Sequence, residues 1–190
     1  MSRLILIFGT QGAGKTTLLS GIKSAKVLNM GDEMLAMYSK KFGIKDRDQM
    51  RAKSLEDYSY MIDARHEILD KAAKLDGVVV VDTHPTVKKG DAYEMGLSFR
   101  DLDALKGKTE AIIYIDASSP EIMARREKER SVRKREKDTE EIINLHRDIN
   151  LSAVSIFSMH LEAPIYIVEN HDGKLAEARN RIEQIIGNTK

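Results

Sequence analysis

Short, unbroken apolar runs alternate with longer amphipathic stretches along this chain of 190 residues. Five of the runs have the length and composition of strands that are buried on both faces of a parallel sheet, residues 4–8, 26–30, 78–82, 111–116 and 164–168. Apolar residues recur at helical spacing in the stretches between them. Strands that alternate with helices predict an α/β fold of three layers, with a five-stranded parallel sheet and right-handed crossovers.

Two stretches lack clear apolar periodicity. Residues 46–55 are rich in charge, and we expect them at the surface. Residues 83–100 contain Pro85, Gly90 and Gly96 and are predicted to form a loop. This loop would leave the carboxyl edge of the sheet, where ligands bind in open α/β folds.

The segment after the first predicted strand has the spacing Gly, four residues, Gly, Lys, Thr that is typical of a phosphate-binding loop. Free N–H groups and the dipole of the following helix attract phosphate oxygens there. We expect Lys15 to reach the β- and γ-phosphates of a nucleoside triphosphate, and the Thr16 hydroxyl to bind Mg²⁺. The alternative is a chance match to the pattern. The predicted nucleotide-binding residues are Gly9, Thr10, Gln11, Gly12, Ala13, Gly14, Lys15, Thr16 and Thr17.

An acid follows the four valines of the third run, at Asp82. In phosphate-loop enzymes an acid at this place helps to hold Mg²⁺, often through water, so Asp82 and Thr16 form the predicted magnesium site. The alternative is that Asp82 caps a turn or a helix. His84 is interpreted as a hydrogen-bonding loop residue rather than a catalytic one.

Composition limits the possible partners. The chain has 31 basic and 30 acidic residues and no cysteine, and its net charge is +1. General binding to nucleic acid or to acidic membranes is therefore not expected, and disulfides and thiolate metal sites are excluded. No apolar run approaches the roughly 20 residues of a membrane span, and the first strand leaves no room for a signal peptide. We expect a soluble, cytoplasmic protein.

One segment is strongly basic, with eight basic and three acidic residues between Arg125 and Lys137 and a local charge of +5. Its arginines include two close pairs, Arg125 with Arg126 and Arg133 with Arg135. Guanidinium groups match phosphate oxygens, so we interpret the segment as a flap that closes over phosphates. A solvated face and an RNA-binding arm are the alternatives, although aromatic residues for base stacking are absent from the segment.

The remaining motifs narrow the class of reaction. The five histidines lack the spacing of a zinc site, and the chain has no Gly-x-Ser-x-Gly elbow. It also lacks the Asn-Lys-x-Asp tetrad of guanine-nucleotide switches, and Thr83 follows Asp82 where mechanical ATPases usually carry a water-activating Glu. A small-molecule kinase fits best, because it requires a closed, dry site and no activated water.

The chain resembles the archaeal type of adenylate kinase, within the P-loop nucleoside monophosphate kinases. The phosphate loop alone is shared by many families. The order and spacing of Asp-Arg-Asp-Gln-Met-Arg at 46–51 and Asp-Thr-His at 82–84 are more specific. Asn-Met-Gly-Asp at 29–32, the basic segment and Asp-Thr at 138–139 also match, so the likeness extends to about residue 150.

The resemblance implies a single P-loop kinase domain over residues 1–190 that transfers the γ-phosphate of ATP to AMP, giving two ADP, with Mg²⁺ bound. It implies a small AMP-binding segment at about residues 31–65, where Arg47 and Arg51 hold the AMP phosphate. It also implies a short lid at about residues 125–138 without zinc, and a homotrimer, since archaeal members are commonly trimeric. The implied catalytic residues are Lys15, Arg126, Arg133 and Arg135.

Two features depart from the family pattern. Residues 88–96 keep little of the proline-rich stretch that usually follows Asp-Thr-His, and this loop should touch the acceptor base. Leu151 follows Asn150 where relatives tend to place an arginine, a role that Arg147 could take from one turn earlier. Both departures concern the identity of the acceptor rather than the class of reaction.

Alternatives remain at three levels. Another nucleotide kinase would use CMP, UMP or a small non-nucleotide acceptor on the same scaffold. A regulatory module would bind ATP without catalysis, and an RNA-binding role would rest on residues 125–137 alone. At the residue level, Arg47 and Arg51 could be surface arginines that pair with Asp46 and Asp48.

Overall fold

The computed structural model describes residues 2–128 and 138–189, and the side chains of Ser2, Arg51 and Leu55 also lie outside its described part. Its centre is a five-stranded, all-parallel sheet, which confirms the predicted fold class. The order across the sheet is β2–β3–β1–β6–β7, so β1 lies in the middle. These strands are β1 (Ser2–Gly9), β2 (Lys26–Asn29), β3 (Gly77–Asp82), β6 (Thr109–Asp116) and β7 (Ile165–Glu169).

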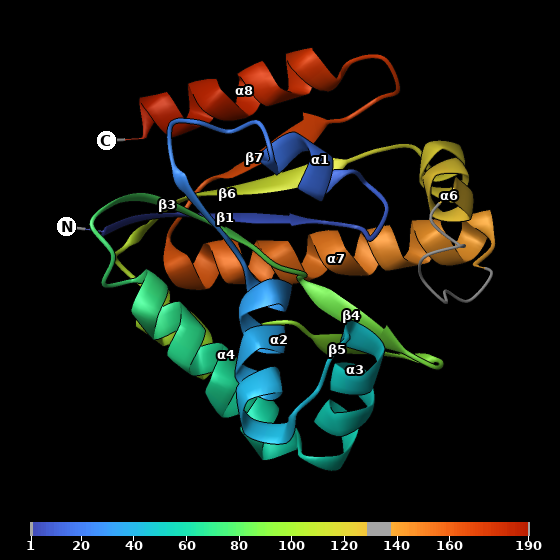
Figure 1. Ribbon diagram of the computed structural model, residues 1–190. Coiled ribbons are helices and arrows are strands. Elements are labelled where there is room, and N and C mark those ends of the chain that lie inside the picture. Colours follow the sequence, from blue (N-terminus) through green and yellow to red (C-terminus); the bar gives the residue numbers. More distant parts are fainter. Residues whose placement is uncertain (1, 129–137, 190) are drawn as a thin grey trace.

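Helices cover both faces of the sheet, as three layers require (Figure 1). One face packs against α1 (Lys15–Leu19) and α8 (Leu175–Asn188). The other face packs against α4 (Tyr58–Ala72), α5 (Phe99–Leu105) and α7 (Glu140–Leu161).

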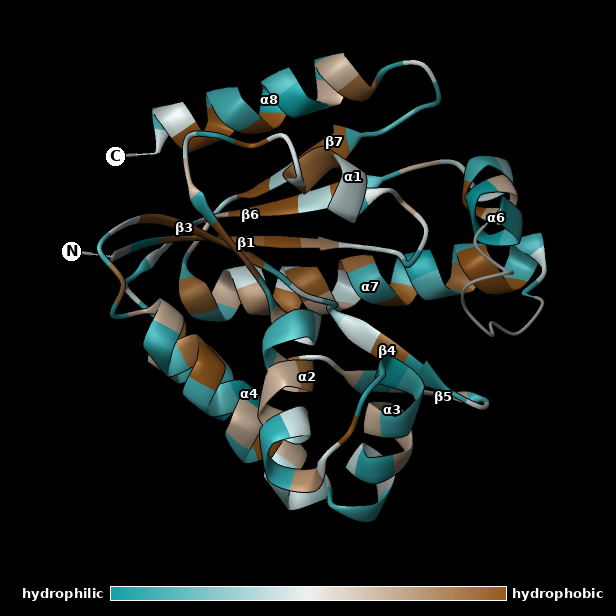
Figure 2. Ribbon diagram, viewed as in Figure 1, coloured by the Kyte–Doolittle hydropathy of each residue, from teal (hydrophilic) through white to brown (hydrophobic). Residues whose placement is uncertain are grey.

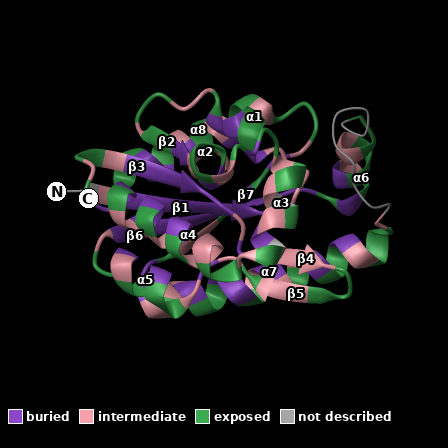
Figure 3. Cartoon of the chain, turned by 60° about the horizontal axis from the view of Figure 1, so that its bottom comes forward, coloured by how far each residue is buried: buried purple, intermediate pink, exposed green. Residues whose placement is uncertain are grey.

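Side chains of β1 alternate between the two hydrophobic layers. Ile5 and Ile7 belong to the layer under α1 and α8, whereas Leu4, Leu6 and Phe8 belong to the layer over α4, α5 and α7. All five side chains are fully buried. Figure 2 shows the central strands as the most hydrophobic part of the chain, and Figure 3 shows them as the most buried. An apolar run without alternation is what burial on both faces produces.

A helical extension follows β2, below the sheet in Figure 1. It consists of α2 (Met30–Phe42), α3 (Arg47–Glu56) and the first part of α4. The rings of Tyr38, Phe42 and Tyr60 lie 5.0 to 5.6 Å apart and join α2 to α4. Ser54 of α3 donates a 3.0 Å hydrogen bond to the Tyr38 hydroxyl. The extension thus has a small aromatic core of its own.

Side-chain caps mark the start of each helix in this extension. Helix α2 begins at Met30, because the Asn29 side chain accepts the N–H of Asp32 and caps the helix. The charged stretch 46–55 lies at the surface as expected, but most of it is helical and is capped by Asp46. Helix α4 begins at Tyr58 and is capped by Asp57, whose side chain accepts the N–H of Tyr60.

The prediction of a loop over residues 83–100 was wrong in part. The chain forms an antiparallel hairpin there, from β4 (Thr86–Lys89) and β5 (Ala92–Met95), with Gly90 in the turn at φ 57°. Both strands have only four residues and carry mostly polar or half-exposed side chains, so they give no apolar signal. Ser98 and Asp101 then form a capping box at the start of α5.

Two helices flank the residues that the structure leaves undescribed, α6 (Ser119–Lys128) and α7. Thr139 caps α7, because its side chain accepts the N–H of Ile142. Across residues 2–128 and 138–189, none of the helices has both the length and the apolar character needed to span a membrane.

Candidate functional site

The phosphate loop connects β1 to α1 at the carboxyl edge of the sheet (Figure 1). Gly14, immediately before α1, has a φ of 88°, and a Cβ there would lie 2.4 Å from the Nδ2 atom of Asn170. At Gly9 a Cβ would lie 2.4 Å from the carbonyl oxygen of Ile115. Only glycine fits both places, so the two glycines of the motif allow the loop to wrap tightly against β6 and the end of β7.

Lys15 is the first residue of α1 and is only 7% exposed. Its Nζ donates a 2.9 Å hydrogen bond to the carbonyl of Gly9, so the side chain folds back over the loop. Thr16 follows it and is exposed in the first helical turn. A helix N-terminus, a buried ammonium and an accessible hydroxyl together can bind a polyphosphate.

Asp82 ends β3 beside the loop, in register with Ile7 of β1 and Asn29 of β2. The Nδ2 of Asn29 donates a 2.6 Å hydrogen bond to Oδ2, whereas the buried Oδ1 has no partner among the described residues. Burial raises the pKa of Asp82 above its usual value, although the positive charge of Lys15 opposes the shift. An unpartnered carboxylate oxygen is a suitable ligand for Mg²⁺ or for its bound water.

Arg47 of α3 reaches the start of α2 and is half-buried there. Its Nη2 donates to Asp32 at 2.6 Å and to the Oδ1 of Asn29 at 3.1 Å. Asn29 in turn holds Asp82, so one amide joins the helical extension to the acid at the end of β3. The guanidinium also covers Gly31, where a Cβ would lie 2.7 Å from Nη1.

Two adjacent arginines of α6 bind backbone carbonyls of the phosphate loop. Arg126 donates from Nε and Nη2 to the carbonyl of Gln11, at 2.9 and 2.7 Å. Arg125 donates from Nη1 to the carbonyl of Ala13 at 3.3 Å. The helix that leads into the basic segment is therefore attached to the outside of the loop.

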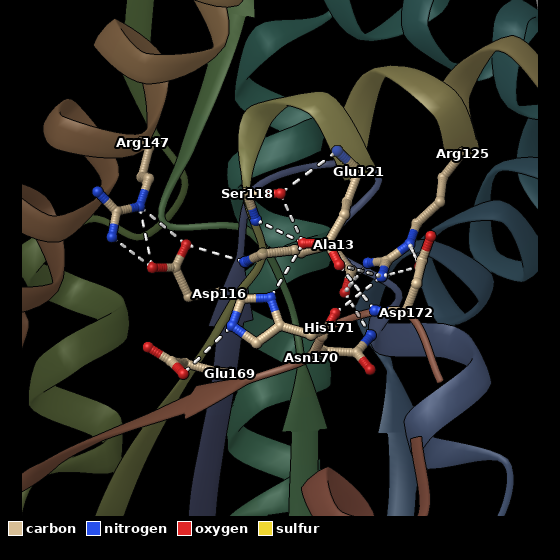
Figure 4. A network of polar contacts seen from close by, with 11 residues as sticks. Ala13, Asp116, Ser118, Glu121, Arg125, Arg147, Glu169, Asn170, His171 and Asp172 are labelled. Atoms are coloured by element: carbon tan, nitrogen blue, oxygen red, sulfur yellow. Dashed lines mark hydrogen bonds and ion pairs between the residues drawn. The ribbon is translucent and has the colours of Figure 1, made fainter. Parts of the chain in front are cut away.

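The chain after β7 binds the same part of the loop, as Figure 4 shows. Nδ2 of Asn170 donates a 2.8 Å hydrogen bond to the carbonyl of Ala13. Arg125 donates from Nη2 to the carbonyl of Asn170 at 2.8 Å and to Asp172 at 2.6 Å. Residues from three distant segments thus meet at one peptide group.

A charged group connects α6, the hairpin and the start of α7. Asp138 accepts a 2.5 Å hydrogen bond from Nη1 of Arg126 and a 3.2 Å hydrogen bond from Nζ of Lys88, which is in β4. All three side chains are largely buried, with 12% to 21% of each exposed. This arrangement brings two cations to the edge of the phosphate loop.

A buried polar chain runs between the hairpin and the loop. Thr86 donates to Oδ1 of Asn150 at 2.6 Å, and Nδ2 of Asn150 donates to the Thr10 hydroxyl at 3.4 Å. His146 lies 3.1 Å from the Thr86 hydroxyl, and burial lowers the pKa of its imidazole. The Thr10 hydroxyl also lies 3.0 Å from the hydroxyl of Tyr114. These neutral contacts fix the hairpin relative to the phosphate loop.

The structure does not describe every predicted site residue. Arg133 and Arg135 lie outside the described residues, as does the side chain of Arg51. Arg147, considered as a substitute for a missing arginine, donates from Nε to both carboxylate oxygens of Asp116 at 2.8 and 3.0 Å, and its Nη2 also contacts Asp116. That contact raises the pKa of Arg147 and holds it at the end of β6.

Several residues of the site were not predicted from the sequence. Asn170 is a single amide in a segment without a motif, and an amide at such a place gives no signal. Asn150 was noted only as the residue before Leu151, and no role in the site was predicted for it. Lys88 belongs to the segment that was interpreted as a loop. Asp138 belongs to the Asp-Thr pair at 138–139 that contributes to the family resemblance, but no role in the site was predicted for it. Asn29 could have been found, because it begins the segment 29–32 that contributes to the family resemblance.

The chain is similar in sequence to known proteins over most of its length. A family model described as an AAA domain matches residues 8–144. The adenylate kinase of Pyrococcus abyssi is 33% identical over 98% of this chain and 96% of its own length. The adenylate kinase of Pyrobaculum aerophilum is 34% identical over 77% of this chain and 74% of its own length.

Solved structures show the same fold at low sequence identity. Shikimate kinase from Acinetobacter baumannii, in complex with shikimate, covers 100% of this chain and 96% of its own, with a TM-score of 0.55 and 15% identity. A putative kinase from Chloroflexus aurantiacus covers 100% of this chain and 98% of its own, with a TM-score of 0.60 and 15% identity.

Proposed function

The chain belongs to the adenylate kinase family and is thus a P-loop kinase of nucleoside monophosphates. We propose that it catalyses the reaction of this family, in which the γ-phosphate of ATP is transferred reversibly to AMP and two ADP are formed. One observation carries the proposal most directly. The phosphate loop lies at one edge of the sheet together with Asp82 and with Arg125 and Arg126 of α6. An acceptor that is itself a phosphate is already anionic, so the site needs no general base.

On the donor side, the phosphate loop holds ATP through its backbone N–H groups and the start of α1. Lys15 moves its ammonium from the Gly9 carbonyl to the β- and γ-phosphates when the nucleotide binds. Arg126, already beside the loop, contributes charge at the transferring group. A positive charge at this place stabilises the transition state most strongly, because negative charge then spreads over the oxygens of the phosphoryl group that is transferred.

The magnesium site consists of the Thr16 hydroxyl and, through water, Asp82. The buried Oδ1 of Asp82 supports this assignment, since a buried acceptor normally has a partner. When bound, Mg²⁺ neutralises charge on the β- and γ-phosphates. Asn29 fixes the orientation of the Asp82 carboxylate for that contact.

The acceptor side is the segment at about residues 31–65, with Arg47 and Arg51 on the AMP phosphate. Arg47 supports this role because its guanidinium already lies near Asn29 and Asp82, within the same edge of the sheet. Residues 125–138 form the lid, and Arg133 and Arg135 close on ATP and the transferring phosphoryl group. These two segments and the sheet make up one kinase domain over residues 1–190.

The protein is proposed to act in the cytoplasm as a homotrimer. Absence of cysteine and of a spanning helix in the described part of the chain supports the first assignment. Three large apolar side chains on the outer side of α7 support self-association. They are Leu145, Ile156 and Met159, with exposed fractions of 53%, 41% and 81%.

An acceptor other than AMP is the second candidate, because the hairpin β4–β5 stands where the family has its proline-rich stretch. A panel of AMP, CMP, UMP and shikimate, each with ATP and Mg²⁺, separates the possibilities by ADP formation. The proposal expects kcat/KM for AMP to exceed that for the other acceptors by at least about tenfold, a margin of about 1.4 kcal/mol. A preference for any other acceptor would replace AMP and leave the donor site unchanged.

A further inference from the structure

We propose that Asn170 is a positioning residue for polyphosphate binding, which holds the Ala13 carbonyl outward so that the N–H of Gly14 faces the phosphates. No motif of the sequence marks Asn170, and it comes from the segment after β7, far from the phosphate loop in the chain. This inference rests on the proposed binding of ATP by the loop and adds a residue that acts through the loop without touching the nucleotide.

The contact is short and buried. Asn170 is 4% exposed, and its Nδ2 lies 2.8 Å from the Ala13 carbonyl oxygen. Arg125 donates to the same oxygen at 3.3 Å. Because a buried carbonyl with two donors would lose both on turning away, these contacts stabilise one orientation of the peptide group.

The peptide geometry makes that orientation important for binding. A trans peptide group is planar, with its C=O and N–H pointing in opposite directions. When the Ala13 carbonyl faces Asn170, the N–H of Gly14 faces the concave side of the loop. Gly14 has a φ of 88° and no side chain to resist rotation, so the loop alone does not fix this peptide.

Asn170 is itself held firmly. Its N–H donates to the carbonyl of Asp116 at 2.8 Å, which continues the pairing of β7 with β6. Glu121 of α6 accepts the N–H of Asp172 at 2.7 Å, and Arg125 donates to the Asn170 carbonyl at 2.8 Å (Figure 4). The amide is therefore presented to the loop from a rigid strand end that is also tied to α6.

Two substitutions separate the hydrogen bond from the shape of the side chain. Asn170→Asp keeps the shape but replaces the donor NH₂ by an oxygen, and Asn170→Ala removes both. Asn180→Asp, an exposed residue of α8, is the control for the change in charge. The measurement is calorimetric titration of each folded variant with ATP and, separately, with AMP.

We expect the dissociation constant for ATP to rise about tenfold or more in both Asn170 variants, while that for AMP stays within about twofold of the original, since AMP needs no contact with the loop. For Asn170→Asp the ATP deficit should shrink between pH 8 and pH 5, because a protonated carboxyl again donates to Ala13. The Asn170→Ala deficit should not change with pH.

Three results would overturn the proposal. These are ATP binding within twofold of the original in both variants, an equal loss for ATP and AMP, and a pH-independent deficit in Asn170→Asp. If Asn170→Ala does not fold, the isosteric Asn170→Asp at the two pH values carries the test alone. Failure of the proposed function would appear separately, as absence of ATP binding or turnover in the unaltered protein.

Discussion

Asp82 has two properties that conflict at neutral pH. Burial raises its pKa, so the folded state penalises the ionised carboxylate, yet the proposed contact with Mg²⁺ requires that charge. For an acid with a raised pKa, the contribution to stability is greatest below the unfolded pKa and declines as the pH rises through the folded pKa. At neutral pH the ionised Asp82 therefore lowers the folding stability of the unaltered protein. The proposed contact with Mg²⁺ is the reason we give for a carboxylate at this buried position.

Asp82→Asn should lower activity at limiting Mg²⁺ by about 10- to 100-fold without lowering the melting temperature. The amide keeps the shape and can accept the hydrogen bond from Asn29, but it lacks the charge. Mg²⁺ titrations of the rate and thermal scans at neutral pH measure both effects. Asp148→Asn, on the exposed side of α7, is the matched control. An unchanged Mg²⁺ requirement would remove Asp82 from the metal site.

Residues of the phosphate loop could be identified from the sequence because the chemistry lies in the backbone and requires glycine at fixed spacing. Asn170 and Asn150 could not be identified in this way. Their partners, Ala13 and Thr10, lie 157 and 140 residues away in the chain, so only the folded sheet brings them together.

At the scale of elements, the segment after β7 is attached to α6 through a charged cluster. His171 lies between two carboxylates, 3.1 Å from Glu121 and 3.2 Å from Glu169 (Figure 4). Hydrogen bonds to Glu121 and Glu169 raise the pKa of His171. Hydrogen bonds, of which the one from Ser118 has the largest effect, lower the pKa of Glu121 to about 2. The Glu121 carboxylate and the His171 imidazolium are therefore both charged in mild acid.

His171→Gln should therefore destabilise the protein in a pH-dependent way. A histidine with a raised pKa contributes stability that is complete below its unfolded pKa of about 6.5 and is lost as the pH rises through the folded pKa. Urea unfolding should show a larger difference between the two proteins at pH 5.5 than at pH 9. Adding 1 M NaCl at pH 5.5 should reduce the difference, because the His171 and Glu169 side chains are accessible to solvent. An equal difference at both pH values and salt concentrations would contradict the assignment.

The hairpin β4–β5 shows why some elements could not be predicted. A short strand whose side chains are polar has no apolar alternation, and its pairing partner is identified only after the turn is formed. Nothing in the sequence around Thr86 indicates that its side chain is buried, yet it packs against Asn150 and His146. The central strands β1, β3 and β6 were predictable because their side chains fill both hydrophobic layers, whereas the four-residue edge strand β2 places only Leu28 in one of them.

At the scale of the whole molecule, the sheet order brings the ends of β1 and β3 together beneath the phosphate loop. The helical extension starts at β2, next to β3, whereas α6 follows β6 on the other side of β1. Segments on opposite sides of one loop suit a reaction between two nucleotides, and this arrangement follows from the topology rather than from any single motif.

The most direct test of the proposed function is incubation of the purified protein with ADP and Mg²⁺ alone. Disproportionation requires two nucleotide sites and no water, so equal amounts of ATP and AMP should form. Lys15→Met should reduce the rate by about 10²- to 10³-fold while the fold stays intact, and Lys23→Met, at an exposed lysine, should not change it. ADP that stays unconverted, or an equal rate in Lys15→Met, would contradict the account.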